Sequence, residues 1–325
     1  HDMNVPRMIT AMKTSLDYFQ TAFGPYQFRQ ARIIEFPGYA SFAQAFANTM
    51  PYSESVGFIA DLRDEEKIDY VTYITAHEMA HQWWAHQVVG ADMQGATTLS
   101  ETLAQYSALM AMEKIYGPDQ IRRFLKRELD AYLTSRGSER LEELPLYRVE
   151  NQGYIHYQKG GSVMYLLRDQ IGEAAVNAAL KSLIDRYAFE GAPNPRSLDL
   201  VAALRANAPA DKQALITDLF ERITLYDVKV TDTTARRLSN GKWDVSVTVE
   251  ARKLYADGEG AETEAPLNET FDVGLFTERP GDGAFDRADV MMFQRQPLRS
   301  GTQTFRFVTD AKPAFAGVDP YNKWI

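Results

Sequence analysis

Three of the chain's five histidines lie within residues 73–87, in the segment YITAHEMAHQWWAHQ. His77 and His81 are four positions apart, and Glu78 directly follows the first of them. On a helix, residues four apart lie on the same face, so both imidazoles can reach one metal ion. Glu78 lies one step further round the helix, where its carboxylate can meet a water on that metal. This HExxH pattern predicts a metal site of the kind that activates water.

A catalytic zinc site uses three protein ligands and keeps a fourth position open. Downstream of His81, the first acidic residue in a predicted helix is Glu101, in TLSETLAQYSAL. Asp92 comes earlier but lies in a loop flanked by glycines. A second helix packed against the first would complete a set of His77, His81 and Glu101 around one zinc ion. Imidazole and carboxylate ligands suit several divalent ions, so the residues alone leave the metal open.

The other histidines and the tryptophans near the motif have structural interpretations. His86 follows the first motif histidine by nine residues, which on a helix points it to the opposite side. His156 either lines the pocket beside Tyr157 or caps a helix. Trp83 and Trp84 are predicted to be core residues rather than a platform for substrate.

The bulk composition predicts a globular protein. The chain has 325 residues, enough for two domains, with 45% hydrophobic and 24% charged residues. No apolar run approaches the length of a membrane helix, and the opening HDMNVPRM is not a secretory signal. A net charge of −9 argues against non-specific nucleic-acid binding. The absence of cysteine excludes disulfides and thiolate zinc ligands, and it fits an extracytoplasmic location.

Residues 1–222 are predicted to be mostly helical. The segment 64–90 has acidic residues in its first turn and ends at Gly90, which predicts one long helix carrying the motif. A second helix is predicted to open after Thr97 or Thr98 and to end at Gly117-Pro118. Further helices are predicted over 119–135, 158–171, 173–188, 197–207 and 211–222. Short strands are predicted in 29–39 and 55–62, forming a small sheet at the edge of the metal site.

After residue 222 the pattern changes to alternation of polar and apolar residues. The turn SNGK, residues 239–242, predicts a hairpin because Asn-Gly accepts positive φ. The sequence therefore predicts an α+β chain with two domains: 1–222, mostly helical, and 223–325, a β-sandwich-like domain of about 100 residues. Strands are predicted over 226–238, 242–256, 269–278 and 303–310, and loops over 256–266 and 279–286.

The motif and its surroundings resemble the gluzincin zinc metallopeptidases of the aminopeptidase N family, which include the leukotriene hydrolases. Here HEMAHQWW is followed by LSETLAQY, and nineteen residues separate His81 from Glu101, one more than the family's usual spacing. The loop VVGADMQGATT can absorb the additional residue. Ser100 and Thr102 stand where the family has Asn and Gly. The resemblance implies a mainly helical, thermolysin-like catalytic domain followed by a small β-sandwich.

Two further residues receive roles from the resemblance. The segment YIHYQKGG resembles the family's Tyr-Glu-Lys-Gly segment, which carries the catalytic tyrosine over to Tyr157. The family's Gly-x-Met-Glu-Asn strand aligns with PYSES, residues 51–55, where only Glu54 matches. In the family that glutamate holds the free α-ammonium of the substrate. Because most of this motif is missing, strict exopeptidase specificity stays open.

The roles implied for these residues together describe an aminopeptidase. His77, His81 and Glu101 hold zinc, which polarises the scissile carbonyl. Glu78 is the general base, and Tyr157 donates a hydrogen bond to the developing oxyanion. The predicted reaction is removal of N-terminal residues from peptides.

The order of segments looks most like bacterial membrane proteins that fuse a multi-span ABC-transporter-type permease to such a peptidase domain. This implies a peptide substrate, permease segments of the same parent protein as partners, and an extracytoplasmic, periplasmic location. Two alternatives stay open. One is another zinc hydrolase of the same site type, an endopeptidase or an epoxide hydrolase. The other is a peptide-binding or structural module of a transporter with little turnover.

Overall fold

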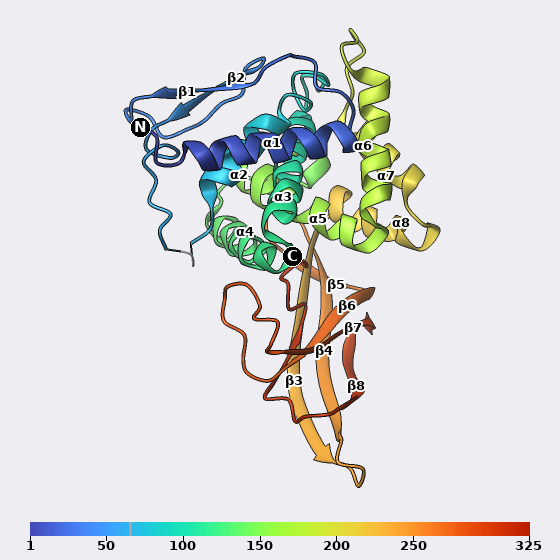
Figure 1. Ribbon diagram of the computed structural model, residues 1–325. Helices are drawn as coiled ribbons and strands as arrows, with labels where there is room; N and C mark the ends of the chain where they lie inside the picture. The colour runs from blue at the N-terminus through green and yellow to red at the C-terminus, as the bar shows by residue number, and fades with distance from the viewer. Residues whose placement is uncertain (65–66) are drawn as a thin grey trace.

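The computed structural model describes residues 1–64 and 67–325, and it has a helical part followed by a part built from strands (Figure 1). The mainly helical fold predicted for the first part is confirmed. Its helices are α1 (Val5–Ala22), α2 (Tyr70–Ala80), α3 (Leu103–Tyr116), α4 (Pro118–Ser138), α5 (Gly160–Ile171), α6 (Glu173–Tyr187), α7 (Ser197–Asn207) and α8 (Gln213–Ile216). Within the described residues, π-helical segments adjoin α3, α5 and α8, namely η1 (Thr98–Thr102), η3 (Tyr154–Lys159) and η5 (Thr217–Glu221), and the 3₁₀ turns are η2 (Leu146–Arg148) and η4 (Ala210–Lys212).

The centre of the helical part is formed by α1, α2 and α3, which all pack against one another (Figure 1). Nine of the 11 residues of α2 are buried, and so are the first ten residues of α3. Helices that are buried nearly all round lie inside a core rather than on its surface. Polar side chains on α2 must therefore find partners inside the protein.

The motif helix is shorter than the predicted range of 64–90, of which residues 65–66 lie outside the described residues. The helix begins at Tyr70 and ends at Ala80. A few residues later Ala85 has φ of 132°, a value that residues other than glycine rarely adopt. The prediction of one long helix is therefore wrong, because α2 ends at the motif and the chain continues through a series of turns over residues 81–88.

A small sheet lies near the start of the chain, but one of its strands is not where the sequence predicts it. β1 (Arg32–Phe36) falls within the predicted strand and pairs in parallel with β2 (Thr49–Ser53). The strand predicted over 55–62 is wrong, since this segment is turn and irregular chain. Gly57 allows the turn to press against Tyr52, because a Cβ at Gly57 would come within 2.4 Å of that ring.

The second part is a sandwich of two antiparallel sheets, which confirms the predicted fold class. In one sheet β4 (Trp243–Ala256) pairs with β3 (Ile223–Arg237), β5 (Glu262–Ala265) and β8 (Gly301–Thr309). In the other, β6 (Asn268–Phe276) pairs with β7 (Val290–Arg299) and β9 (Phe315–Val318). The SNGK turn joins β3 to β4, as predicted. β7 and β9 have no counterpart among the predicted strands, and β5 lies in a segment predicted as loop.

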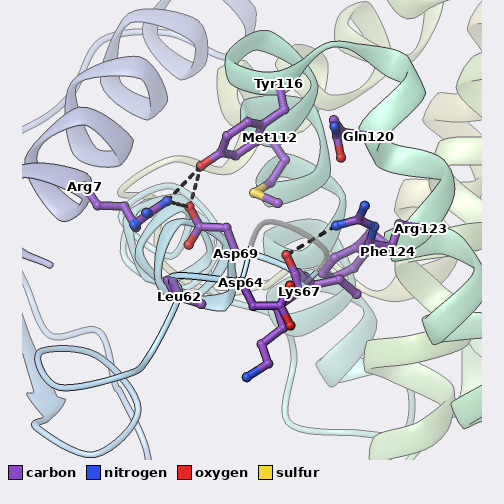
Figure 2. A pocket seen from close by; sticks show the side chains of 11 residues that line it. Arg7, Leu62, Asp64, Lys67, Asp69, Met112, Tyr116, Gln120, Arg123 and Phe124 are labelled. Carbon is purple, nitrogen blue, oxygen red and sulfur yellow. Dashed lines mark hydrogen bonds and ion pairs between the residues drawn. The ribbon is translucent and has the colours of Figure 1, made fainter. Parts of the chain in front are cut away.

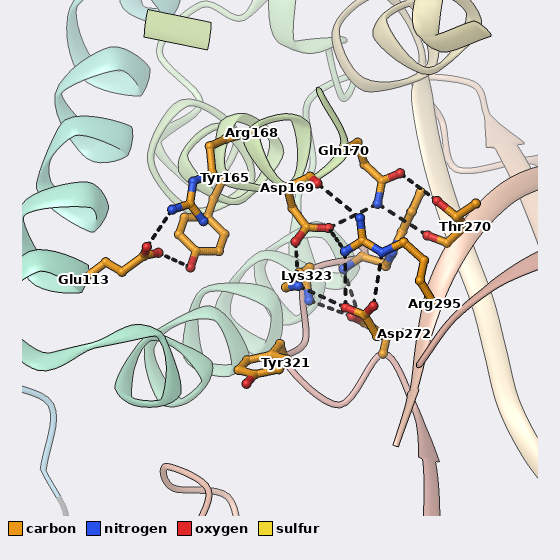
Figure 3. Close-up of polar contacts among 12 residues, drawn as sticks. Glu113, Tyr165, Arg168, Asp169, Gln170, Thr270, Asp272, Arg295, Tyr321 and Lys323 are labelled. Atoms are coloured by element: carbon orange, nitrogen blue, oxygen red, sulfur yellow. Dashed lines mark hydrogen bonds and ion pairs between the residues drawn. The ribbon is translucent and has the colours of Figure 1, made fainter. Parts of the chain in front are cut away.

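The two parts are joined by a shared core and by ion pairs. One cluster of buried apolar side chains includes residues from both parts. Lys323, near the end of the chain, donates to Asp169 of α5 at 2.7 Å and to Asp272 of β6 at 3.1 Å (Figure 3). The change from helix to strand falls between Glu221 and Ile223. The division into two domains at that point stays a prediction.

Candidate active site

The N-terminal end of α2 is fixed by the carboxylate of Asp69. Its Oδ1 accepts a hydrogen bond from the backbone N–H of Thr72 at 2.9 Å, as in a helix N-cap. Arg7 from α1 and Tyr116 from the end of α3 point at the same carboxylate and bond to it (Figure 2). The three residues are part of the lining of a cavity of about 250 Å³. Their contacts fix the start of α2, about two helical turns before His77.

The structure brings His77, His81 and Glu101 together. The two histidine Nε2 atoms are 3.0 Å apart, and Oε2 of Glu101 lies 3.3 Å from the first and 3.4 Å from the second. Nδ1 of His81 faces the carbonyl oxygen of Trp84 at 2.9 Å. That contact places the ring proton on Nδ1 and leaves the Nε2 lone pair directed at the other two ligands. The turn after α2 thus orients one of the three side chains.

Glu101 lies in η1, the π-helical turn that leads into α3. Such turns are rare, and many occur at functional sites. The next residue, Thr102, donates its hydroxyl to the carbonyl oxygen of His156 at 2.7 Å. The turn that carries Glu101 is therefore tied directly to η3, the segment that carries Tyr157.

Gly95, just ahead of η1, has no room for a side chain. Its φ is 86°, and a Cβ would lie 2.2 Å from the carbonyl oxygen of Tyr147. We expect Gly95→Ala to lower the free energy of unfolding by more than about 1 kcal/mol and to weaken zinc binding, because η1 must shift. Urea unfolding and zinc titration check this. Gly117→Ala is the control, since Gly117 has φ of 81° but no atom within 4 Å of the added Cβ. Equal losses in the two variants would contradict the role of the close approach.

Tyr157 enters the same site from η3. Its ring centroid lies 6.0 Å from that of His77 and 4.4 Å from that of His156. Burial and the nearby Glu101 carboxylate raise the pKa of Tyr157 well above its ordinary value. The phenol therefore keeps its proton and remains a hydrogen-bond donor.

The two carboxylates of the site differ in their basicity. Burial raises the pKa of Glu78, and its electrostatic interactions with His77 and His81 offset only part of this. Burial would also raise the pKa of Glu101, but its bonds to His77 and His81 hold that pKa well below the usual range. For His81, burial lowers the pKa, but the bond to Glu101, the negative charges of Glu101 and Glu78 and the contact with the Trp84 backbone together outweigh it, and the net shift is upward. Glu101 is thus the anionic partner of the histidines, while Glu78 is the more basic group.

Glu54 is not brought to this site. Its Oε1 accepts a hydrogen bond from the backbone of Gly38 at 2.7 Å, and its Oε2 lies 3.5 Å from Nδ1 of His1. It does not belong to the lining of the cavity that contains the motif. The assignment of Glu54 to the substrate's α-ammonium stays a prediction: the residue directly follows the end of β2.

The cavity at the motif has a volume of about 430 Å³, and one of its walls is the segment 42–45, which the sequence did not single out. This segment runs beside β2, with the backbone N–H of Gln44 donating to the carbonyl of Pro51 at 3.1 Å. It makes only isolated bridges, such as that between Ala43 and Tyr52. A stretch so short carries no alternation by which a sequence could reveal it. The cavity is lined by Phe42, Ala43, Gln44, Ala45, His77, Glu78, His81, Ala85, Ser100, Glu101 and Tyr157.

The aromatic residues around the motif have supporting positions. Trp83 and Trp84 are fully buried, which confirms that they belong to the core. His86 contacts the carbonyl oxygen of Ala45 at 3.2 Å, and so it packs behind the wall of the cavity. His156 is buried against the ring of Tyr157.

The three ligand atoms fit a zinc ion. With ligand bonds of about 2.0–2.2 Å, two ligands of a tetrahedral zinc ion lie roughly 3.3–3.6 Å apart. The separations from Glu101 to the two histidines, 3.3 and 3.4 Å, lie in this range, and the two Nε2 atoms are slightly closer at 3.0 Å. A buried glutamate adjoins the ligands, and the cavity reaches them from one side. The fold and the site define a mainly helical metallohydrolase of the HExxH type.

The comparison with protein families agrees with this class. The model described as "Peptidase family M1 domain" matches residues 7–222, which is more than half of the chain. The chain belongs to peptidase family M1. This confirms the predicted resemblance to the aminopeptidase N family, and it supports both the metallopeptidase class and the zinc cofactor.

The chain is similar to curated aminopeptidases over a fraction of their length. It is 24% identical over 188 residues to endoplasmic reticulum aminopeptidase 2 of Homo sapiens, which covers 55% of this chain and 19% of that protein. It is 25% identical over 262 residues to aminopeptidase M1 of Arabidopsis thaliana, covering 72% of this chain and 29% of that one. The crystal structure of Legionella pneumophila aminopeptidase A in complex with aspartic acid matches 97% of this chain and 34% of its own, with 15% identity and a TM-score of 0.58, so the fold is shared.

Proposed function

We propose that the chain is the catalytic part of a zinc-dependent peptidase that removes N-terminal residues from peptides. The observation that carries the proposal is the convergence of His77, His81 and Glu101 with Glu78 and Tyr157 on one cavity. The similar proteins are named aminopeptidases, which supports cleavage at the amino end. The chain spans less than a third of their length, so their activity is part of the proposal.

His77, His81 and Glu101 are the residues that would hold zinc. When bound, the metal supplies Lewis acidity that polarises the scissile carbonyl and acidifies water. Glu78 takes the proton from the attacking water and returns it to the leaving amine. Its burial suits this role, because a carboxylate with a raised pKa accepts a proton more readily.

Tyr157 stabilises the charge that develops on the carbonyl oxygen. It is a neutral phenol that lines the cavity, so its O–H can donate to an oxyanion. Removing one such donor typically costs about 10²–10³ in rate. We therefore expect Tyr157→Phe to lower kcat by that factor.

The peptide lies along the segment 42–45. Ser53 donates to the carbonyl of Phe42, and Gln44 donates to Pro51, so one edge of this short strand is occupied by β2. An extended strand directs alternate backbone groups to opposite sides, so a peptide can add at the other edge. The role of Glu54 in binding the α-ammonium stays a prediction, and the choice between amino-terminal and internal cleavage therefore depends on the similarity to aminopeptidases.

Incubation of the zinc-loaded chain with a mixed peptide pool tests this function, with mass spectrometry of the products. The matched sample is the same protein stripped by a chelator and then resupplied with zinc. Stepwise loss of N-terminal residues that follows the metal supports an aminopeptidase. Internal cuts that follow the metal would replace it with an endopeptidase. No metal-dependent product would overturn the proposal in favour of a peptide-binding or structural module.

The cellular context is a separate part of the proposal. Among the described residues, no helix has the length and hydropathy that a membrane span requires. Fusion to permease segments and a periplasmic location stay predictions from the resemblance. Detection of the chain in a larger membrane protein, with this part accessible from outside the cytoplasm, would support them.

A further inference from the structure

A buried cluster of charged and phenolic groups lies beneath η3, on the side of α4. Lys159, the last residue of η3, is only 2% exposed. Its ammonium group donates to the hydroxyl of Tyr132 on α4 at 3.1 Å and lies 3.7 Å from Oε1 of Glu143. The Tyr132 hydroxyl in turn donates to Glu143 at 2.6 Å. The lysine is thus attached to two groups outside its own segment.

Glu143 has a second cationic partner besides Lys159. Nε of Arg136 donates to its Oε2 at 2.7 Å, and this arginine also lies 3.3 Å from Glu262 of β5. Lys159 therefore adds a second positive charge to a cluster in which Arg136 is shared between Glu143 and Glu262. Burial lowers the pKa of Lys159 to about 8, even though Glu143 opposes that shift.

The burial of the Lys159 ammonium group is not expected to increase the free energy of unfolding. An ammonium group removed from water loses its hydration, and an apolar side chain of similar volume avoids that loss. Buried charges of this kind are retained in some proteins because they fix one arrangement among several. The position of Lys159 indicates which arrangement it fixes.

Lys159 ends the π-helical turn that carries Tyr157, two residues earlier. The opposite face of the turn is held by η1, where Thr102 donates to the carbonyl of His156. Gly160 permits that approach, because a Cβ there would lie 2.4 Å from the Thr102 hydroxyl. The turn is therefore held from the metal side by Thr102 and from the α4 side by Lys159, with Tyr157 between the two attachments.

We propose that Lys159 is a positioning residue, whose attachment to Tyr132 and Glu143 fixes η3 so that the Tyr157 hydroxyl points at the reacting carbonyl. The proposal rests on the proposed function, since it assumes that Tyr157 acts on the oxyanion. A displacement of about 1 Å in a catalytic group can cost about 10² in rate. Zinc content should change little without Lys159, because its own contacts are with Tyr132 and Glu143, while Thr102 holds η1 against η3 by a separate bond.

The test is a double-mutant cycle with Lys159→Met and Tyr157→Phe. We expect Lys159→Met alone to lower kcat by about 10–100-fold, with KM and zinc content nearly unchanged. In the Tyr157→Phe background the same substitution should change kcat by less than about twofold, because the group it positions is gone. A lysine that serves only stability would lower kcat by the same factor in both backgrounds.

The cycle has one control variant, and a second variant tests the same contact if the first does not fold. Lys181→Met, at an exposed lysine paired with Asp185 on α6, should leave kcat unchanged. If Lys159→Met does not fold, Tyr132→Phe removes the hydroxyl that Lys159 bonds and should show the same dependence on Tyr157. Equal factors in both backgrounds, or an unchanged kcat in Lys159→Met, would overturn the proposal. If Tyr157→Phe alone has no effect, the oxyanion role and the positioning role both fail, while metal-dependent cleavage of the peptide pool still decides the function.

Discussion

Glu78→Gln is expected to lower kcat for peptide hydrolysis by at least about 10²–10⁴ while zinc remains bound at one ion per chain. The amide has nearly the shape of the carboxylate but cannot accept a proton from water at neutral pH. Glu78 lies on the buried α2 between the two motif histidines, and burial raises its pKa. Its loss therefore removes the base without removing a ligand. Steady-state rates on a peptide found in the pool experiment, with zinc measured by atomic emission, check this.

The matched control is Glu259→Gln, which makes the same chemical change at an exposed turn of the sandwich. It should leave both kcat and zinc content unchanged. A Glu78→Gln variant that keeps its zinc and more than a tenth of its kcat would contradict the role of general base. A variant that loses zinc would show instead that this carboxylate supports the metal.

The sequence predicts the central site well because local patterns encode it. The spacing of His77 and His81 requires only one helical turn, and α2 provides it. The end of the following helix is marked by Gly117 and Pro118, where α3 stops as predicted. The Asn-Gly turn likewise marks the β3–β4 hairpin. Each of these features depends on residues close together in the chain.

The parts that the sequence misses depend on contacts between distant segments. The turn at Ala85 has a backbone φ that alanine rarely adopts, so the residue type at this position does not predict the turn. The wall at 42–45 exists because it runs beside β2, and its few bridges leave no periodicity. A π-helical turn such as η1 has no distinct hydrophobic period either. Glu54 was assigned by an alignment in which one residue matched, and it is not among the residues that line the cavity.

Glu101 completes the set of ligands that begins with the two motif histidines. Its substitution is expected to have a large effect on zinc affinity. We expect Glu101→Gln to weaken zinc binding by at least about 10² and to leave the purified chain with less than one zinc ion. The carboxylate lies within 3.4 Å of both histidine Nε2 atoms and is held ionised by them. A neutral amide keeps the shape but loses the charge that balances the metal. Competition against a chelator of known affinity measures the change.

Asp92→Asn is the control that shows whether the loss of zinc affinity is specific to Glu101. Asp92 is the other acidic residue between the motif and η1, and it is exposed in the loop ahead of Gly95. Its substitution should leave zinc affinity and kcat unchanged. If Glu101→Gln bound zinc as tightly as the unsubstituted chain while Asp92→Asn did not, the loop would supply the third ligand. In that case η1 would have to move on metal binding, and Thr102→Val, which removes the bond to His156, should then change zinc affinity as well.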